Sequence, residues 1–365
     1  MRRQRTRASS TSCRRRNRRG SRTSPLPPRT ASRQKAGFPA FWLHRNFVSG
    51  LLWPLSHLFA WLARRRRARL VAQRLAVPVV VVGGITVGGA GKTPLTLHLV
   101  EALRRRGYAP AIISRGYGGA VSGEMEVRPD SSAGVVGDEP LLLRRRANCP
   151  VFVGADRVAA GKALLATHPE VDLILCDDGL QHYRLARDFE IAVFDRRGLG
   201  NGWQLPAGPL REPINRLREV DAVVLNDAPL AAIEMAGSPA AVFSMRLEGA
   251  EFFALHDPAR KIAAAALRER TLHAVAGIGE PQRFFDHLKA LGLAFEPHAF
   301  PDHHAYEAGE LAFGDGVILS TEKDAVKLRA VLAPDVEAWV LPVTAVLSPG
   351  LDQLIVEKLN GRAPA

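Results

Sequence analysis

The chain has 365 residues, of which 47% are hydrophobic, and its 50 Lys and Arg against 36 Asp and Glu give a net charge of +14. Residues 1–37 hold 13 of the basic residues and no acidic one, which leaves 37 basic against 36 acidic residues in the remainder. This near-neutral remainder argues against a nucleic-acid-binding surface spread over the fold. Three widely spaced cysteines exclude a disulfide framework and favour a reducing compartment.

Residues 1–37 are rich in Arg, Ser, Thr and Pro and contain almost no apolar side chains. Such a segment cannot bury enough surface to offset the loss of chain entropy, so we expect a disordered basic tail. The tail is either an electrostatic tether to anionic phosphate or lipid, or an upstream extension without a function of its own. No small-residue cleavage site follows a compact apolar core, which argues against a transit peptide or a cleavable signal.

Residues 38–70 contain an apolar stretch that ends in an arginine cluster, Arg64 to Arg67 and Arg69. A clean membrane span needs about 20 apolar residues, and polar residues interrupt this shorter stretch. We expect a membrane-associated helix, for which seating in the interface is favoured over a single span, with the arginines against anionic lipid on the cytoplasmic side. The alternative is an amphipathic helix packed on the domain. The apolar side chains at helical spacing are Phe47, Leu51, Leu55, Leu58 and Leu62.

From residue 77 onward, short apolar runs alternate with helical stretches, which is typical of a largely parallel α/β sheet. We expect two α/β lobes, a first at 71–228 and a smaller second at 229–365. One helix should run through Leu95 to Leu103 and another through Phe284 to Leu291. The expected strands are 79–82, 111–114, 171–176, 191–194, 222–225, 272–276, 317–319 and 338–341.

The strongest local motif is a glycine-rich turn between the first strand and the helix after it, in VVVVGGITVGGAGKTP (79–94). Glycines let backbone N–H groups converge on phosphate oxygens, and the helix N-terminus adds partial positive charge. Lys92 can then reach the β- and γ-phosphates, and the Thr93 hydroxyl can ligate Mg²⁺. Thr86 replaces the first glycine of the strict P-loop pattern, so the loop is a variant. The expected nucleotide-binding residues are Gly88, Gly89, Ala90, Gly91, Lys92 and Thr93.

Two acidic residues, Asp177 and Asp178, follow the apolar run 171–176. Carboxylates at the end of a buried strand beside a phosphate loop suit Mg²⁺ at the β- and γ-phosphates. The alternative is that one of them caps the following turn. Gln181 and His182 follow at the same rim, as orienting or substrate-binding groups.

A second acidic pair, Asp138 and Glu139, stands before Pro140 at the expected start of a helix. The residues alone leave two interpretations open, a favourable charge at the helix N-terminus or a catalytic role. His303 and His304 are adjacent, and adjacent side chains of a strand point to opposite faces, so a zinc site there is disfavoured.

Seven motifs, in this order, resemble the tetraacyldisaccharide 4'-kinase family of lipid A biosynthesis in Gram-negative bacteria. The resemblance covers about residues 38–365, including the variant glycine loop, and leaves residues 1–37 without a counterpart. The motifs are ITVGGAGKTP (85–94), SRGYGG (114–119), VGDEP (136–140), DDGLQH (177–182), LPAGPLREP (205–213), FPDHH (300–304) and TEKDAVKL (321–328).

The resemblance implies a membrane-associated P-loop kinase with two α/β/α lobes joined by a short β linker. Such a kinase moves the γ-phosphoryl group of ATP, with Mg²⁺, onto the 4'-hydroxyl of a tetraacylated glucosamine disaccharide 1-phosphate. It would act at the cytoplasmic face of the inner membrane, with lipids as partners, no nucleic acid and no obligate protein partner.

The resemblance also assigns roles to residues. Asp138 looks like the general base, His303 like the partner that tunes it, and Glu139 like a supporting acid. Asp177 and Asp178 correspond to the acidic pair near Mg²⁺. Further candidates for holding the anionic disaccharide are Arg157 and Arg211.

Two other classes of protein carry similar loops. A P-loop ATPase of the partitioning type often has a lysine before the paired glycines, where this chain has Val87. A membrane-bound regulatory GTPase would need an N-K-x-D guanine-reading sequence, which this chain lacks.

Overall fold

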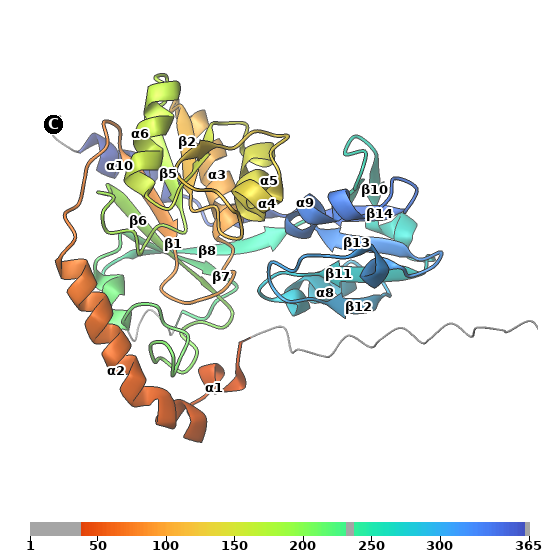
Figure 1. The fold of residues 1–365 in the computed structure, drawn as a ribbon, viewed down its shortest axis with the longest axis horizontal. Helices are drawn as coiled ribbons and strands as arrows, with labels where there is room; N and C mark the ends of the chain where they lie inside the picture. The colour runs from red at the N-terminus through yellow and green to blue at the C-terminus, as the bar shows by residue number, and fades with distance from the viewer. Residues whose placement is uncertain (1–37, 231–236, 362–365) are drawn as a thin grey trace, which may run out of the picture. The chain divides into compact units, whose positions relative to one another are not determined.

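The computed structural model describes residues 38–230 and 237–361; the basic tail expected at 1–37 lies outside these ranges. A nine-stranded sheet has the order β15-β8-β7-β6-β1-β5-β2-β4-β3 (Figure 1). Its strands are parallel except for the antiparallel edges β3 and β15. The strands are β1 (Val79–Gly83), β2 (Pro110–Ser114), β3 (Met125–Glu126), β4 (Val151–Val153), β5 (Leu173–Asp177), β6 (Phe189–Asp195), β7 (Ala222–Asn226), β8 (Ala241–Glu248) and β15 (Thr344–Leu347).

Both faces of this sheet are covered, which explains why its central strands are apolar without alternation. In β1, Val80 and Val82 belong to a core shared with one set of helices, while Val79 and Val81 belong to the core of the opposite face. The first set is α3 (Lys92–Arg105), α5 (Asp138–Ala147) and α10 (Leu351–Asn360), and α6 (Arg157–Thr167) covers the opposite face. The short elements α4 (Ala133–Val136) and η1 (Ile214–Arg218) lie in the connections.

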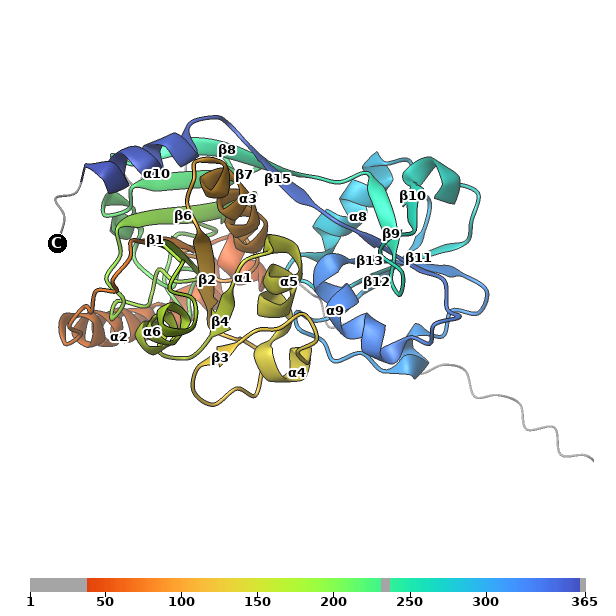
Figure 2. The same ribbon diagram turned by 90° about the horizontal axis from the view of Figure 1, so that it is seen from above.

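A second, six-stranded sheet has the order β10-β9-β14-β13-β11-β12 (Figure 2). Phe284 and Leu288 of α8 pack in the core of one face, and Ala325 and Leu328 of α9 pack in the core of the other. Its elements are β9 (Glu251–Ala254), β10 (Lys261–Ala263), η2 (Ala264–Leu267), β11 (Leu272–Ala276), α8 (Pro281–Ala290), β12 (Glu296–Ala299), η3 (Ala308–Leu311), β13 (Val317–Thr321), α9 (Glu322–Val331) and β14 (Ala338–Leu341). The expected fold class, two α/β/α lobes, is confirmed.

The two sheets do not divide the chain at residue 228, where the sequence predicts the boundary. β8 pairs with β7, and after the second sheet the chain returns so that β15 pairs with β8 and α10 packs on the first core. The chain therefore crosses between lobes twice, at 249–250 and at 342–343. Glu248 pairs with Thr344 beside these crossings. They are so close that a Cβ on Gly249 would lie 2.2 Å from the Pro342 carbonyl oxygen.

The helix expected within 38–70 is α2 (Phe47–Ala68), preceded by the short α1 (Ala40–Leu43). Small residues, Ser49, Ser56 and Ala60, are the buried part of α2. The Ser56 hydroxyl donates to the Gln204 carbonyl at 2.8 Å. The apolar stripe faces outward instead, with 85% of Phe47 exposed. The helix is therefore packed on the domain, as the alternative expected, but through its small residues and not through its apolar stripe. Across the described residues, no helix combines the length and the apolar character that crossing a bilayer would require.

Candidate active site

The glycine-rich loop, residues 84–91, connects β1 to α3 at the carboxyl edge of the first sheet. Gly91 has a φ of 91°, and a Cβ there would lie 2.4 Å from the Asn226 amide nitrogen, so a side chain is excluded. No described side chain caps α3, and its first N–H groups are therefore free to receive an anion. The Lys92 Nζ lies 3.0 Å from Asp178 Oδ1 at the same edge.

Asp177 is the last residue of β5, which lies next to β1 in the sheet. Its carboxylate is buried and accepts a hydrogen bond from the Thr96 hydroxyl at 3.1 Å. Burial, together with the nearby carboxylates of Glu139 and Asp178, raises the pKa of Asp177 to about 7. Burial is the largest cause, and repulsion from the two neighbouring carboxylates adds to it in favouring the protonated form of Asp177.

Asp178 follows in a left-handed conformation, with a φ of 48°, which turns its side chain toward two cations. Besides the contact with Lys92, its Oδ2 lies 3.1 Å from Nη1 of Arg211. Burial alone would raise the pKa of Asp178, but the charges of Lys92 and Arg211 outweigh it and hold that pKa well below its usual range. The Gln181 side chain donates to Glu212 at 2.7 Å.

Asp138 begins α5, and its carboxylate meets His303 from the second lobe. Both carboxylate oxygens lie 3.1 Å from His303 Nδ1, and Lys327 Nζ lies 3.3 Å from Oδ2. Burial would raise the pKa of Asp138, but the hydrogen bond to His303 and the charges of Lys323 and Lys327 lower it instead. The same hydrogen bond raises the pKa of His303. The pair therefore favours a carboxylate beside an imidazolium.

Lys323, on α9, was not predicted as a site residue, although it belongs to the TEKDAVKL motif. Its Nζ lies 2.9 Å from Glu139 Oε1 and 2.9 Å from Asp302 Oδ1, and 3.4 Å from His303 Nε2. Its four-residue offset from Lys327 places both lysines on one face of α9. This spacing of two lysines is the feature of the sequence that could have identified Lys323 as a site residue. His304, the neighbour of His303, contacts Glu310 instead.

One cavity of about 1820 Å³ joins these groups. It extends from the glycine-rich loop along α2 and reaches the second lobe at residues 278–287 and 302–303. Three predicted residues, Ala90, Asp138 and Asp177, are buried and do not line it, whereas His303, which contacts Asp138, does. The predicted site residues that line the cavity are Gly88, Gly89, Gly91, Lys92, Thr93, Glu139, Asp178, Gln181, His182, Arg211 and His303.

Arg157 does not line the cavity with the other predicted site residues. It is the first residue of α6, is 2% exposed, and donates to the Gly154 carbonyl at 2.6 Å. Burial lowers its pKa. His182 does line the cavity, and burial together with the charge of Arg157 lowers its pKa to about 4, so its ring is neutral at pH 7. Arg157 therefore affects the site through its charge, which lowers the pKa of His182, and not by lining the cavity.

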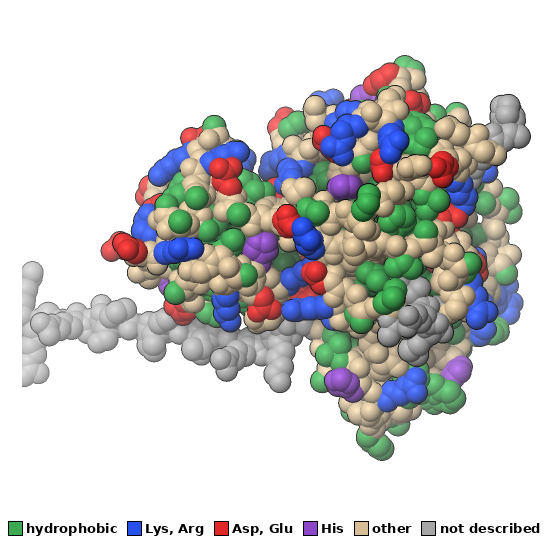
Figure 3. Space-filling model, turned by 180° about the vertical axis from the view of Figure 1, so that it is seen from behind, with side chains coloured by type: hydrophobic (Ala, Val, Ile, Leu, Met, Phe, Trp, Pro, Cys, Tyr) green, Lys and Arg blue, Asp and Glu red, His purple; other side chains and the backbone are tan. Residues whose placement is uncertain are grey.

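Opposite charges from the two lobes meet beside the cavity, as the red and blue side chains between the lobes in Figure 3 illustrate. Arg196 contacts Glu280 at 2.6 Å. Arg283 of α8 donates to the side-chain oxygen Oδ1 of Asn226, and the side-chain Nδ2 of Asn226 donates to the Ala90 backbone carbonyl at 3.0 Å. The second lobe is therefore linked to the glycine-rich loop through one amide side chain, which the sequence patterns had not indicated.

Comparisons with known proteins found similar sequences and a similar structure. A family model described as Tetraacyldisaccharide-1-P 4'-kinase matches residues 48–360. Two curated relatives are named tetraacyldisaccharide 4'-kinase. One, from Dechloromonas aromatica, is 52% identical over 334 residues, covering 91% of this chain and 96% of the relative. The other, from Azoarcus sp. (strain BH72), is 54% identical over 334 residues, covering 90% and 97%.

A solved structure is similar over both lobes. It is a crystal structure of LpxK from Aquifex aeolicus in complex with ATP, with a TM-score of 0.71 and 28% sequence identity. The similarity covers 86% of this chain and 100% of that chain.

Proposed function

The chain belongs to the tetraacyldisaccharide-1-P 4'-kinase family, and from this premise we propose the reaction that its cavity performs. The γ-phosphoryl group of ATP is transferred to the 4'-hydroxyl of a tetraacylated glucosamine disaccharide 1-phosphate, which yields the bisphosphorylated lipid A precursor. The observation that carries the proposal is the cavity that is lined by the glycine-rich loop, by α2 and by His303, whose ring contacts the buried Asp138 carboxylate. The alternative from the sequence, a partitioning-type ATPase, would not explain the Asp138–His303 pair or why the cavity extends along α2.

Phosphoryl transfer depends mainly on positioning and on neutralising charge. The amides of the glycine-rich loop and the N-terminus of α3 hold the triphosphate, and Lys92 exchanges its contact with Asp178 for the β- and γ-phosphates. Thr93, Asp177 and Asp178 would offer the oxygen donors that Mg²⁺ prefers, and a cation there would relieve the repulsion that the Glu139 and Asp178 carboxylates exert on Asp177. Bound there, Mg²⁺ supplies charge neutralisation at the phosphates.

The proton of the sugar hydroxyl goes to the Asp138–His303 pair. The Asp138 carboxylate accepts it, and the proton is shared with His303 across the 3.1 Å contact. This gives the carboxylate–imidazolium pair that the low pKa of Asp138 and the raised pKa of His303 favour. Lys323 holds Glu139 and Asp302 beside the pair. Arg211 and Gln181 at the opposite rim are placed to contact the anionic disaccharide.

The direct test combines purified protein, ATP, Mg²⁺ and the disaccharide 1-phosphate lipid. We expect a lipid product heavier by one phosphate, and fragmentation in the mass spectrometer should locate that phosphate on the distal sugar. ATP hydrolysis without a phosphorylated lipid would refute the kinase and favour a simple ATPase.

The activity should decrease at low pH because of His303. We expect kcat/KM to fall about tenfold per pH unit below a pKa that lies above the ordinary histidine value of about 6.5. The direction follows from the hydrogen bond to Asp138, which raises the pKa of His303. Below that pKa the ring already holds a proton, so the pair cannot accept another, and above it the activity reaches a plateau. The measurement is kcat/KM between pH 5 and pH 9.

Two variants separate this titration from others in the protein. His303→Ala should remove the acid limb together with most of the activity. His304→Ala should keep the limb, because His304 contacts Glu310 outside the cavity. An acid limb in the wild type that is centred near an ordinary carboxylic pKa would contradict the proposal.

We propose that α2 holds the enzyme at the cytoplasmic face of the inner membrane without spanning it. Its outward residues include Phe47 and Leu51, which are 85% and 70% exposed, and such a contiguous apolar surface is typical of an interaction site. The arginines at 64–67 continue from the same helix and suit anionic headgroups. Because residues 57–70 also line the cavity, an acylated substrate can reach the site without leaving the lipid.

Replacing Leu51 and Leu55 together by aspartate should weaken binding to vesicles of anionic phospholipid by about 30-fold. This magnitude takes half of the roughly 1.5–3 kcal/mol that burying each leucine contributes. Co-sedimentation with vesicles measures the affinity. Met125→Asp is the matched control, because Met125 is an exposed apolar residue of β3, at the edge of the sheet. Equal loss of binding in the control, or none in the α2 variant, would refute the membrane role of α2.

A further inference from the structure

Three possible metal ligands converge in the second lobe, away from the cavity. His273 is on β11, and Glu296 and His298 are on β12, the edge strand of the six-stranded sheet. The two strands are parallel, with His273 paired to Glu296 and Val275 to His298. Since side chains of a strand alternate between faces, this register brings all three side chains to one face of the sheet. None of the three lines the cavity.

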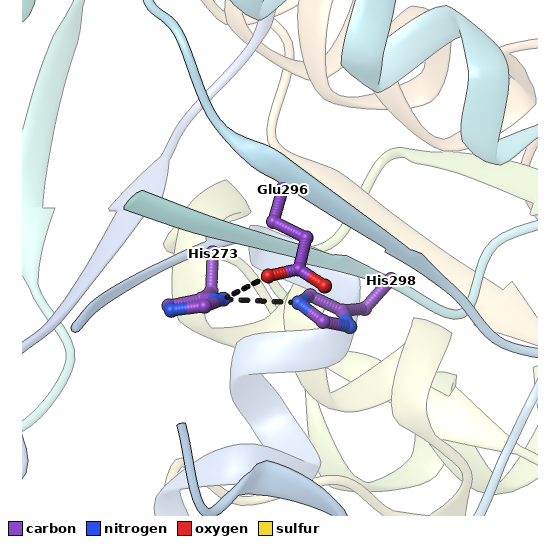
Figure 4. A group of neighbouring side chains, drawn as sticks. All are labelled: His273, Glu296 and His298. Atoms are coloured by element: carbon purple, nitrogen blue, oxygen red, sulfur yellow. Dashed lines mark hydrogen bonds and ion pairs between the residues drawn. The ribbon is translucent and has the colours of Figure 1, made fainter. Parts of the chain in front are cut away.

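The ligand atoms of these residues face one another (Figure 4). His273 Nδ1 lies 3.1 Å from His298 Nε2 and 3.5 Å from Glu296 Oε2, and all three ligand atoms lie within 4.8 Å of one another. In tetrahedral zinc sites, ligand atoms about 2.0–2.1 Å from the ion lie about 3.3 Å apart. The two separations from His273 lie on either side of that value, and the third, between Glu296 and His298, is at most 4.8 Å, so side-chain shifts alone can bring the three atoms around an ion.

The two rings are fixed in this orientation by their neighbours. Phe313 stacks on both of them, with ring centroids 4.5 Å from His273 and 4.2 Å from His298. A Cβ on Gly316 would lie 2.5 Å from Nε2 of His273, so that nitrogen faces Gly316, and Nδ1 faces the other two ligands. Rigid ligands of this kind reduce the ordering cost of binding.

Hydrogen bonding among the three side chains accounts for their convergence less well than a bound cation does. One proton can join His273 Nδ1 to either His298 Nε2 or Glu296, whereas a cation is attracted to all three electron pairs at once. Two imidazoles and one carboxylate suit Zn²⁺ and leave a fourth position for water. The Glu296 side chain is 67% exposed, which gives the ion a path from solvent.

We propose that His273, Glu296 and His298 form a Zn²⁺-binding site that clamps the edge strand β12 to β11. The clamp has a place in the architecture, because β12 ends at Ala299 and the next segment, 300–304, carries His303. The ion would hold the origin of that segment without taking part in phosphoryl transfer.

The test is a calorimetric titration of the full, tag-free protein with Zn²⁺ in the presence of MgATP. We expect about one equivalent of Zn²⁺ in the wild type that His298→Ala does not bind at the same concentration, with an affinity reduced by about 100-fold or more. Glu296→Gln should weaken binding by about tenfold or more. His256→Ala is the matched control, because His256 is an exposed histidine of the same lobe, and it should bind as the wild type does.

A crystal of the protein soaked in Zn²⁺ gives an independent readout. An anomalous peak of zinc between the three side chains would support the site even where a variant proved unstable. Equal zinc binding by the wild type and the His298→Ala variant, or a peak only at other residues, would overturn the proposal.

Discussion

Replacing Asp138 by alanine should lower kcat by roughly 10²–10⁴-fold, the range that a positioned general base contributes. The affinity for ATP should stay within about threefold, because Asp138 lies at the start of α5 and not in the glycine-rich loop. A sugar hydroxyl is a poor nucleophile, and without the carboxylate its proton has no acceptor in the pair. Steady-state assays measure kcat, and equilibrium binding of ATP measures the affinity.

The loss of Asp138 also leaves the charges of Lys327 and His303 without their partner. The melting temperature of each variant must therefore accompany its kinetics. Asp138→Asn keeps the shape and a hydrogen-bond acceptor for His303, so it should fold as the wild type does and still lose turnover. Asp130→Ala, at an exposed aspartate of the same lobe, should leave kcat unchanged. Weakened ATP binding with normal turnover in the Asp138 variants would contradict the assignment.

Replacing Lys92 by alanine should weaken ATP binding by about 10- to 100-fold, since hydrogen bonds to charged groups contribute about 1.5–3 kcal/mol. Turnover should fall further, because the charge that develops on the transferred phosphoryl group loses its cation. The structure supports the assignment: Lys92 is the second cation at Asp178, and Arg211 keeps that carboxylate paired when the lysine is gone. The fold should therefore tolerate the substitution.

Lys261→Ala is the matched control for Lys92→Ala. Lys261 is an exposed lysine of the second lobe whose ammonium lies 3.0 Å from the exposed Glu251 carboxylate. It should bind and turn over ATP as the wild type does. Lys92→Arg keeps the charge but changes its size and geometry, so partial activity is expected. Unchanged ATP affinity and turnover in Lys92→Ala would refute the role of the glycine-rich loop.

The sequence predicted those parts of the site that follow directly from a strand. The runs 79–82 and 171–176 became β1 and β5, and because these strands are adjacent and parallel, Lys92 and Asp178 meet at one edge. For Asp138 and Glu139 the local pattern left a helix start and a catalytic role equally open. The structure fits both interpretations, because Asp138 is the first residue of α5 and its carboxylate also contacts His303.

Contacts that depend on tertiary packing were not predictable from local patterns. Arg157 carries a charge that suggested substrate binding, yet its long side chain is enclosed at the start of α6. Whether such a side chain points outward is decided by the elements around it rather than by its neighbours in the chain. Lys323 was missed for the same reason, since it reaches Glu139 from a helix 184 residues away. The return of β15 to the first sheet has no local signal, because strand pairing is non-local.

The paired crossings at Gly249 and Pro342 determine how the second lobe can move. A domain attached through a single flexible linker could turn in any direction, but two adjacent connecting segments must bend together. We therefore expect any swing of the second lobe to occur about one hinge axis, and such a swing would change the 3.1 Å contact between His303 and Asp138. A bulkier residue in place of Gly249 would push the two strands apart and change that axis, so a glycine that does not itself line the cavity affects how His303 meets Asp138.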